Sequence, residues 1–119
     1  MEILTGVFDF PSFKSSGPQI MTRTFSFRNR VAQASAVLTG YDAEFTRADH
    51  NFGRLTVELN TEVRNISGGA EVTVAARYGL RDNSGHWDDL YEGQVRFCLL
   101  VEPERLLSTV VLELATDGE

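Results

Sequence analysis

The stretch Gly53-Arg-Leu-Thr-Val-Glu-Leu-Asn-Thr-Glu-Val63 alternates apolar and polar side chains residue by residue. Successive side chains of a β-strand point to opposite faces of the sheet, so a period of two predicts a strand that is buried on one side. The side expected to face the core carries Leu55, Val57, Leu59, Thr61 and Val63. The opposite side, expected to face solvent or a subunit interface, carries Arg54, Thr56, Glu58, Asn60 and Glu62.

Five other segments share this period, and turn-forming residues separate them. The segments are residues 5–10, 22–27, 32–39, 71–78 and 94–102. The turns include Lys14-Ser-Ser-Gly-Pro18 and Asn65-Ile-Ser-Gly-Gly69, and Pro11 is expected to end the first strand. The alternation predicts that the inward side chains are Phe25, Phe27, Ala34, Ala36, Leu38, Val72, Val74, Ala76, Tyr78, Val95, Phe97, Leu99 and Val101.

Short strands separated by turns, with no long helical segment, predict an all-β fold. We expect one domain over residues 1–119, an antiparallel β-sandwich of six or seven strands, with a closed barrel as the alternative. The segment 103–114 fits two descriptions. Leu106, Leu107, Val110, Val111 and Leu114 recur at helical spacing, whereas Thr109-Val-Val-Leu-Glu-Leu114 is good strand material and slightly favours a strand.

Composition excludes several classes of function. The chain has 119 residues and a formal charge of −6, from 11 basic and 17 acidic residues, which argues against binding the phosphates of nucleic acids. No run approaches the ~20 apolar residues of a membrane span. The start, Met1-Glu-Ile-Leu-Thr5, lacks the basic region of a signal peptide. We therefore expect a soluble protein, cytoplasmic or released without a classical signal, with Cys98 as a buried small hydrophobic residue.

Both histidines and the single tryptophan lie in two glycine-bounded segments, residues 40–53 and 79–93. Each follows a predicted strand and is rich in carboxylates and aromatic side chains, and long connections on a rigid scaffold often bind ligands. If successive strands from Ala32 onward are antiparallel, both segments lie at the same end of the domain. The sequence therefore predicts one binding region built from two loops.

Flat aromatic faces beside polar side chains are typical of sites for sugar rings. Trp87, Tyr91 and Tyr41 are the candidate platforms, and an alternative role for Trp87 is to cover the end of the core. The polar side chains expected to take the sugar hydroxyls are His86, Asp82, Asn83, Asp88, Asp89 and His50.

Metal binding and catalysis have weaker support in the sequence. Asp82, Asn83, Asp88 and Asp89 resemble part of an oxygen-ligand loop for Ca²⁺, although Asp82-Asn-Ser-Gly85 is better explained as a tight turn. His50 and His86 are too far apart in sequence to indicate a transition-metal site. No nucleophile, zinc-protease or phosphate-loop motif is present, so we expect no enzyme activity and no cofactor, with Ca²⁺ as the one alternative.

The order of features from Phe25 to Glu102 resembles the H-type lectin family. The resemblance rests on Phe25-Ser-Phe27, Ala34-Ser-Ala-Val-Leu38, Leu55-Thr-Val-Glu-Leu59, Val72-Thr-Val-Ala-Ala76, His86-Trp87 and Val95-Arg-Phe-Cys-Leu-Leu-Val101. It implies a six-stranded antiparallel sandwich that forms trimers and binds N-acetylgalactosamine-type sugars, with His86 and Trp87 in the site. Similar small sandwiches also form knobs on phage tail fibres.

Two functions follow as expectations. The first is a lectin-like module that binds a glycan or glycoprotein through residues 40–53 and 79–93 and assembles as a homo-oligomer, a trimer if the resemblance holds. The second is a structural or receptor-binding module, in which the polar face around Glu58 or the segment 103–114 makes subunit contacts.

Overall fold

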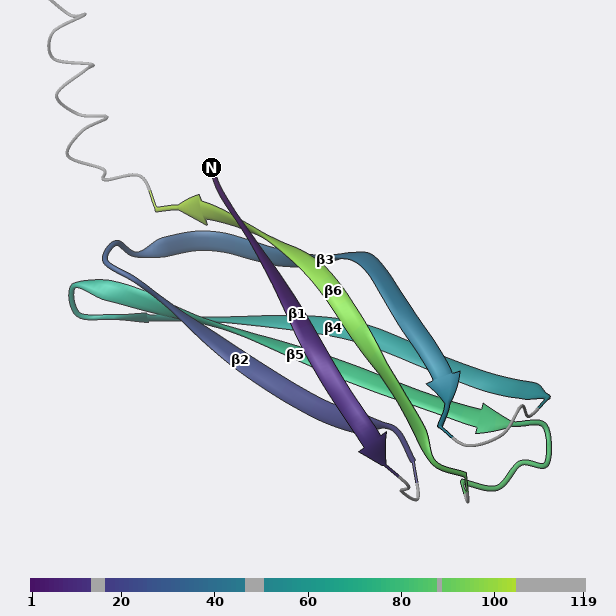
Figure 1. Ribbon diagram of the computed structural model, residues 1–119. Helices are drawn as coiled ribbons and strands as arrows, with labels where there is room; N and C mark the ends of the chain where they lie inside the picture. Colours follow the sequence, from purple (N-terminus) through teal and green to yellow (C-terminus); the bar gives the residue numbers. More distant parts are fainter. Residues whose placement is uncertain (14–16, 47–50, 88, 105–119) are drawn as a thin grey trace, which may run out of the picture.

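The computed structural model describes residues 1–13, 17–46, 51–87 and 89–104 of the 119-residue chain. These residues form long β-strands joined by short connections, and the strands run roughly along one axis (Figure 1). Within this part of the chain there are six strands: β1 (Glu2–Phe13), β2 (Gln19–Phe27), β3 (Val31–Phe45), β4 (Phe52–Ile66), β5 (Gly69–Asp82) and β6 (Tyr91–Pro103).

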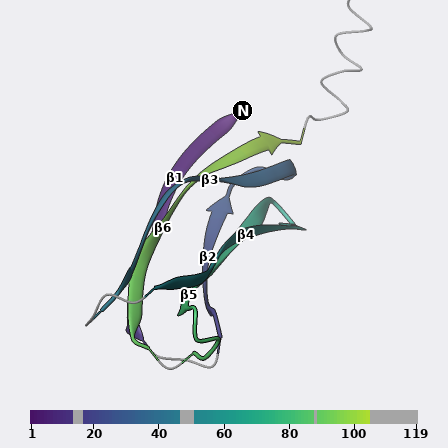
Figure 2. The same ribbon diagram turned by 90° about the vertical axis from the view of Figure 1, so that its right-hand side faces the viewer.

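The strands described above make two three-stranded antiparallel sheets, which confirms the predicted all-β antiparallel sandwich. Sheet A has the order β1-β6-β3, and sheet B has the order β2-β5-β4. Figure 2 shows the two sheets as separate layers, with the connections between β5 and β6 at one end. In this part of the chain no helix is long and apolar enough to cross a membrane.

The core lies between the sheets and is built mainly by their central strands. Side chains from β5 and β6 alternate inward, as the period of two predicts: Ala70, Val72, Val74, Ala76, Tyr78 and Leu80 from β5, and Tyr91, Val95, Phe97, Leu99 and Val101 from β6. Phe8 and Phe10 of β1 complete it, and the Phe8 and Phe97 rings stack at 5.2 Å. On β4 the predicted inward residues are half-buried and the outward ones mostly exposed, which confirms the alternation in the opening stretch.

Two hydrogen-bonded contacts join the edge strands β3 and β4 across the gap between the sheets. The Asn65 side chain accepts from the Val31 N–H (2.8 Å) and donates to the Val31 carbonyl oxygen (2.9 Å). The Thr61 hydroxyl oxygen accepts from the Ala36 N–H at 3.0 Å. An edge strand leaves some backbone N–H and C=O groups without a partner strand. Here inward polar side chains of β4 form hydrogen bonds with such backbone groups of β3.

Several predicted boundaries were wrong, because the strands are longer than the alternating runs. β1 continues past Pro11 to Phe13, with a register shift between Phe10 and Phe13. A second irregularity in β3, between Leu38 and Gly40, reverses which residues face the core. Leu38, predicted to face the core, is 42 % exposed. Of the predicted element over 103–114, the structure describes only Pro103, where β6 ends, and Glu104; residues 105–114 lie outside the described chain.

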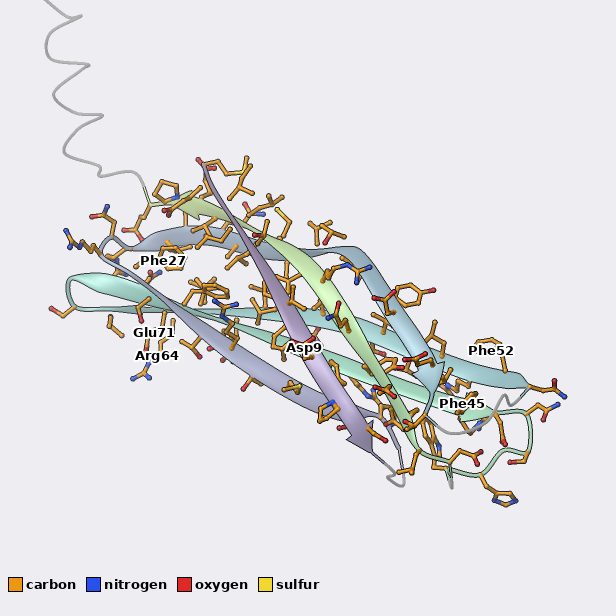
Figure 3. All side chains as sticks on the ribbon, in the orientation of Figure 1. Asp9, Phe27, Phe45, Phe52, Arg64 and Glu71 are labelled. Carbon is orange, nitrogen blue, oxygen red and sulfur yellow. The ribbon has the colours of Figure 1, made fainter. Side chains whose placement is uncertain are left out.

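The outer faces of the two sheets differ in chemistry. Sheet B is polar outside: Arg64 lies 3.6 Å from Glu71 and Arg77 lies 3.6 Å from Glu58, and Figure 3 shows the labelled Arg64 and Glu71 together near one end. Sheet A carries Ile3, Val7 and Val37 on its outer face, exposed by 62 %, 45 % and 46 %. Cys98 lies on that face between Thr5 and Val37 and is half-buried, so the prediction that it belongs to the core was wrong.

Candidate functional site

The connections after β3 and after β5 meet at one end of the sandwich. The Asn83 N–H donates to the Asn51 carbonyl oxygen (3.0 Å), and the Thr46 N–H donates to the Leu90 carbonyl oxygen (2.9 Å). Both connections therefore lie at the same end of the sandwich, as antiparallel succession predicts, and we call this the loop end. The connections are shorter than the glycine-bounded segments, because β3 extends to Phe45 and β5 to Asp82. Figure 3 places Phe45 and Phe52 there, on either side of the first connection.

An aromatic cluster closes the core at the loop end. Trp87 is half-buried with its ring centroid 6.2 Å from that of Tyr91, and the Tyr91 ring meets Tyr78 edge-on at 5.5 Å. The absence of a side chain at Gly79 allows this packing, because an added Cβ would lie 2.9 Å from the Trp87 ring. Trp87 thus has the contacts of a residue that covers the end of the core, which is the alternative role that the sequence allows.

Tyr91 is no candidate for ligand contact in this structure. Its side chain is 0 % exposed, and its hydroxyl donates to the Gly17 carbonyl oxygen at 3.2 Å. The bond ties the connection between β1 and β2 to the same end of the sandwich. Because its ring has no exposed surface, Tyr91 packs beneath the loop end and is not available to contact a sugar there, contrary to the prediction from sequence.

The Asp82-Asn-Ser-Gly85 segment is a turn. The Asp82 carboxylate accepts from both the backbone N–H and the hydroxyl of Ser84, and Gly85 has a φ of 86°, a conformation that glycine adopts without strain. A carboxylate that bonds its own backbone two residues on is a common way to form a turn. In the described part of the chain no group of three His, Cys, Asp or Glu side chains is arranged to hold a metal ion.

The remaining predicted residues are scattered. Asn83 and His86 are exposed on the second connection, and Asp89 is half-buried there. Tyr41 belongs to β3 and is 44 % exposed. His50 and Asp88 lie outside the described residues. Among the residues that the structure describes, the two connections come together, but the predicted polar side chains do not gather around one point.

A hollow of about 760 Å³ lies next to the loop end over all three strands of sheet A. Its volume is in the usual range of small-ligand sites, ≈300–1,000 Å³. It combines four carboxylates and an amide with small and apolar residues. The lining residues are Asp9, Phe10, Pro11, Asp42, Ala43, Glu44, Glu92, Gly93 and Gln94.

One row of hydrogen-bonded polar side chains crosses the sheet at this hollow. Gln94 of β6 donates to Asp9 of β1 at 2.8 Å and accepts from Arg96 at 3.2 Å, and Arg96 contacts Asp42 of β3 at 2.9 Å. Figure 3 shows the labelled Asp9 on β1. The Arg96 charge offsets the Asp42 charge in this row.

The next row towards the loop end has no such compensation. Glu44 of β3 is the direct cross-strand partner of Glu92 of β6, and like charges in such positions lower the stability of a sheet. Neither side chain forms a hydrogen bond or ion pair within the described residues. This part of the hollow therefore offers carboxylate oxygens to a ligand.

Tyr78 forms the floor beneath this row. Burial raises the pKa of its phenol far above the ordinary value, and the hydroxyl donates to the Glu92 carbonyl oxygen at 2.6 Å. Gly93 provides the space, since an added Cβ would lie 2.8 Å from the Tyr78 ring. The buried, neutral phenol of Tyr78 thus holds the backbone of Glu92, one of the two carboxylate residues of the Glu44–Glu92 pair.

Comparison with known proteins adds no assignment: no protein-family model, curated protein or solved structure matches the chain.

Proposed function

We propose that this chain is a carbohydrate-binding, lectin-like module without enzyme activity, and that the hollow on sheet A receives the sugar. The observation that carries the proposal is the hollow itself, about 760 Å³ in volume and lined by Asp9, Asp42, Glu44, Glu92 and Gln94. Carboxylates and amides accept hydrogen bonds in fixed directions, which suits a ligand with several hydroxyl donors.

The position of these groups supports the same proposal. They project from three paired strands and not from the connections, so their backbone is held in a sheet, and sites built on strands are held more precisely than sites on loops. The resemblance to the H-type lectin family adds the same ligand class as an expectation, together with a trimeric assembly. In this version of the proposal, the sugar lies against the carboxylates and the amide of the hollow, and Trp87 supports the loop end.

A glycan array probed at neutral pH, with and without calcium, tests the proposal. The wild-type chain should bind a defined set of glycans, and Glu92→Gln and Gln94→Ala should weaken that binding by about tenfold, the loss of one charge-assisted or two neutral hydrogen bonds. Glu62→Gln is the matched control, because Glu62 is exposed on the outer face of sheet B. An array without a bound glycan, or equal losses for Glu92→Gln and Glu62→Gln, contradicts the proposal.

A second candidate is an interaction module for a protein partner with a basic segment, and the Glu44–Glu92 pair favours it. A Lys or Arg side chain placed between two opposing carboxylates would relieve their repulsion and form charge-assisted hydrogen bonds with them. An arginine-rich decapeptide should then bind with an affinity that falls as salt is raised. Unchanged affinity in Glu44→Gln rejects this candidate, and sedimentation of the chain alone tests the proposed homo-oligomer.

A further inference from the structure

The outer face of sheet B carries rows in which an arginine of β4 or β5 lies opposite a charged residue of the other strand. In two of these rows the charges are opposite, because Arg64 and Arg77 each lie 3.6 Å from a glutamate of the paired strand. In the row nearest the loop end, Arg54 of β4 is the direct cross-strand partner of Arg81 of β5. Like charges in such positions lower the stability of a sheet, so this row requires a separate explanation.

The Arg54 and Arg81 side chains leave the sheet on the same face. Their neighbours along the strands, Leu55 and Leu80, belong to the core or pack against it, and successive side chains of a strand point to opposite faces. Residues directly opposite each other have Cβ atoms about 4.5–5.5 Å apart. Two guanidinium groups therefore share one small area of the outer face, with Arg54 exposed and Arg81 half-buried.

No carboxylate neutralises this row within the described part of the chain. Neither Arg54 nor Arg81 forms a hydrogen bond or an ion pair with another described residue. The Nε–H of Arg81 is buried and has no acceptor. A buried donor without an acceptor lowers the stability of a fold, so such a group is retained where another benefit, such as ligand binding, offsets the cost. A bound anion supplies the missing acceptor.

A β-bulge lies directly before Arg54 on β4. The register of β4 on β5 shifts between Phe52 and Arg54, and Figure 3 places Phe52 at the loop end. Gly53 lies within the shift, and an added Cβ there would lie 2.1 Å from the Asp82 carbonyl oxygen. Bulges redirect side chains and occur often beside functional sites. Here the bulge sets the position of one of the two arginines.

The row beside the arginines adds a hydroxyl group and an aromatic wall. Thr56 follows Arg54 on the same face of β4 and is half-buried, and its cross-strand partner is Gly79. Gly79 leaves the space over β5 free for the Trp87 ring, which an added Cβ would approach to 2.9 Å. The carboxylate of Asp82, next to Arg81 in sequence, is engaged in the turn after β5.

We propose that Arg54 and Arg81 form a binding site for a tetrahedral oxyanion, a phosphate or sulfate group, with the Thr56 hydroxyl as a third donor. A guanidinium group presents its donors in a planar fork and binds oxyanions through paired hydrogen bonds. A phosphate group matches two such forks in charge and in number of oxygens, whereas a carboxylate has one charge and two oxygens. The inference does not depend on the proposed function, because the hollow assigned to the sugar lies on sheet A.

Calorimetric titration of the full chain with inorganic phosphate, sulfate and acetate tests the proposal at one ionic strength and at about pH 7.5, where phosphate is mainly dianionic. Phosphate and sulfate should bind, and acetate should bind at least about tenfold more weakly, since it cannot serve both forks. Equal affinity for acetate and phosphate, or no binding of either tetrahedral anion, overturns the inference.

Two matched variants separate this site from general charge effects. Arg54→Gln removes a guanidinium group of the row and should weaken phosphate binding by about tenfold, the loss of one charge-assisted contact. Arg64→Gln removes the same charge from an exposed position 3.6 Å from Glu71 and should leave phosphate binding unchanged. Because Arg54 is exposed, the variant should fold, and in chloride it should melt no lower than the wild type, since repulsion is relieved. Equal losses in the two variants contradict the proposal.

The source of the anionic group is distinguished by titration with glucose 6-phosphate and glucose 6-sulfate, with glucose as the control. Tighter binding of an ester than of the free anion assigns the site to a phosphorylated or sulfated ligand, and the reverse order assigns it to the free anion. Glu92→Gln alters the hollow on sheet A and should leave ester binding unchanged. Ester binding that falls in Glu92→Gln but not in Arg54→Gln places the ester in that hollow and overturns the inference.

Discussion

Gly93 permits two close approaches at once, one to the β3 backbone and one to a core ring. An added Cβ would lie 2.1 Å from the Asp42 carbonyl oxygen and 2.8 Å from the Tyr78 ring. Paired strand backbone cannot move aside as a flexible side chain does. We therefore expect Gly93→Ala to lower the free energy of unfolding by about 1–3 kcal/mol, the usual cost of overpacking.

Urea denaturation of Gly93→Ala and of Gly17→Ala provides the comparison. An added Cβ at Gly17 would meet no heavy atom within 4 Å, so Gly17→Ala should change the midpoint little. Equal midpoints for the two variants would contradict the packing described at Gly93.

Tyr78 links stability to alkaline pH. Burial is the main cause that raises its pKa above the ordinary value of 10.0. Above pH 10 the unfolded chain releases this proton while the folded chain retains it, so the folded state binds more protons and stability falls as pH rises. The loss from this one group is at most about 1.4 kcal/mol per pH unit.

The difference between the wild type and Tyr78→Phe isolates this contribution, because other titrating groups cancel. At neutral pH the variant should be less stable by about 1 kcal/mol, since the Glu92 carbonyl oxygen loses its donor. Between pH 10 and pH 12 the difference should shrink and then reverse. A constant difference over that range would show that Tyr78 ionises alike in both states.

At the scale of elements, the contact between β4 and β3 depends on one amide. The Asn65 side chain both accepts from and donates to the backbone of Val31, which is 2 % exposed. Removing the amide leaves a buried N–H without its acceptor, at a cost of about 1–3 kcal/mol. We expect Asn65→Ala to lower the melting temperature clearly, and Asn60→Ala, on the exposed side of the same strand, to lower it little.

A strand built from an alternating run could be predicted from sequence, because burial on one face requires a period of two. Leu55, Val57 and Leu59 of β4 face inward as that rule demands. In β3 the rule holds for Ala34 and Ala36, which pack against the core, but it does not extend through the strand, because the irregularity between Leu38 and Gly40 shifts the phase by one residue. Such a shift depends on pairing with a partner strand, so the sequence of β3 alone does not contain it.

The same limit explains why the hollow was missed while the meeting of the connections was foreseen. Antiparallel succession is sufficient to bring Thr46 and Asn51 to the same end as Asn83 and Leu90. The hollow instead joins Asp9, Asp42 and Gln94, which become neighbours only through the register of β1 and β3 on β6. No local pattern in the sequence encodes that register, although the neighbouring Gly93 was a usable signal for close approach in a strand.

At the scale of the whole molecule, the chain order makes the two sheets interdependent. β1 pairs with β6, the first described strand with the last, and β2 pairs with β5, so neither sheet consists of consecutive strands. Each sheet also buries its central strand only against the other. Such non-local pairing is slow to form, typically in milliseconds to seconds, and it leaves no contiguous segment with a core of its own.

We therefore expect residues 1–104 to unfold as one cooperative unit. Trp87 packs against the core at the loop end and is the only tryptophan of the chain, so its fluorescence reports that end, whereas far-UV circular dichroism reports all strands. The two signals should follow the same transition in urea, as two-state unfolding requires. An earlier fluorescence transition in the wild type would show that the loop end opens separately. The Gly93→Ala variant sharpens the test: its altered contact is local to the loop end, yet in a cooperative sandwich it must shift both transitions equally.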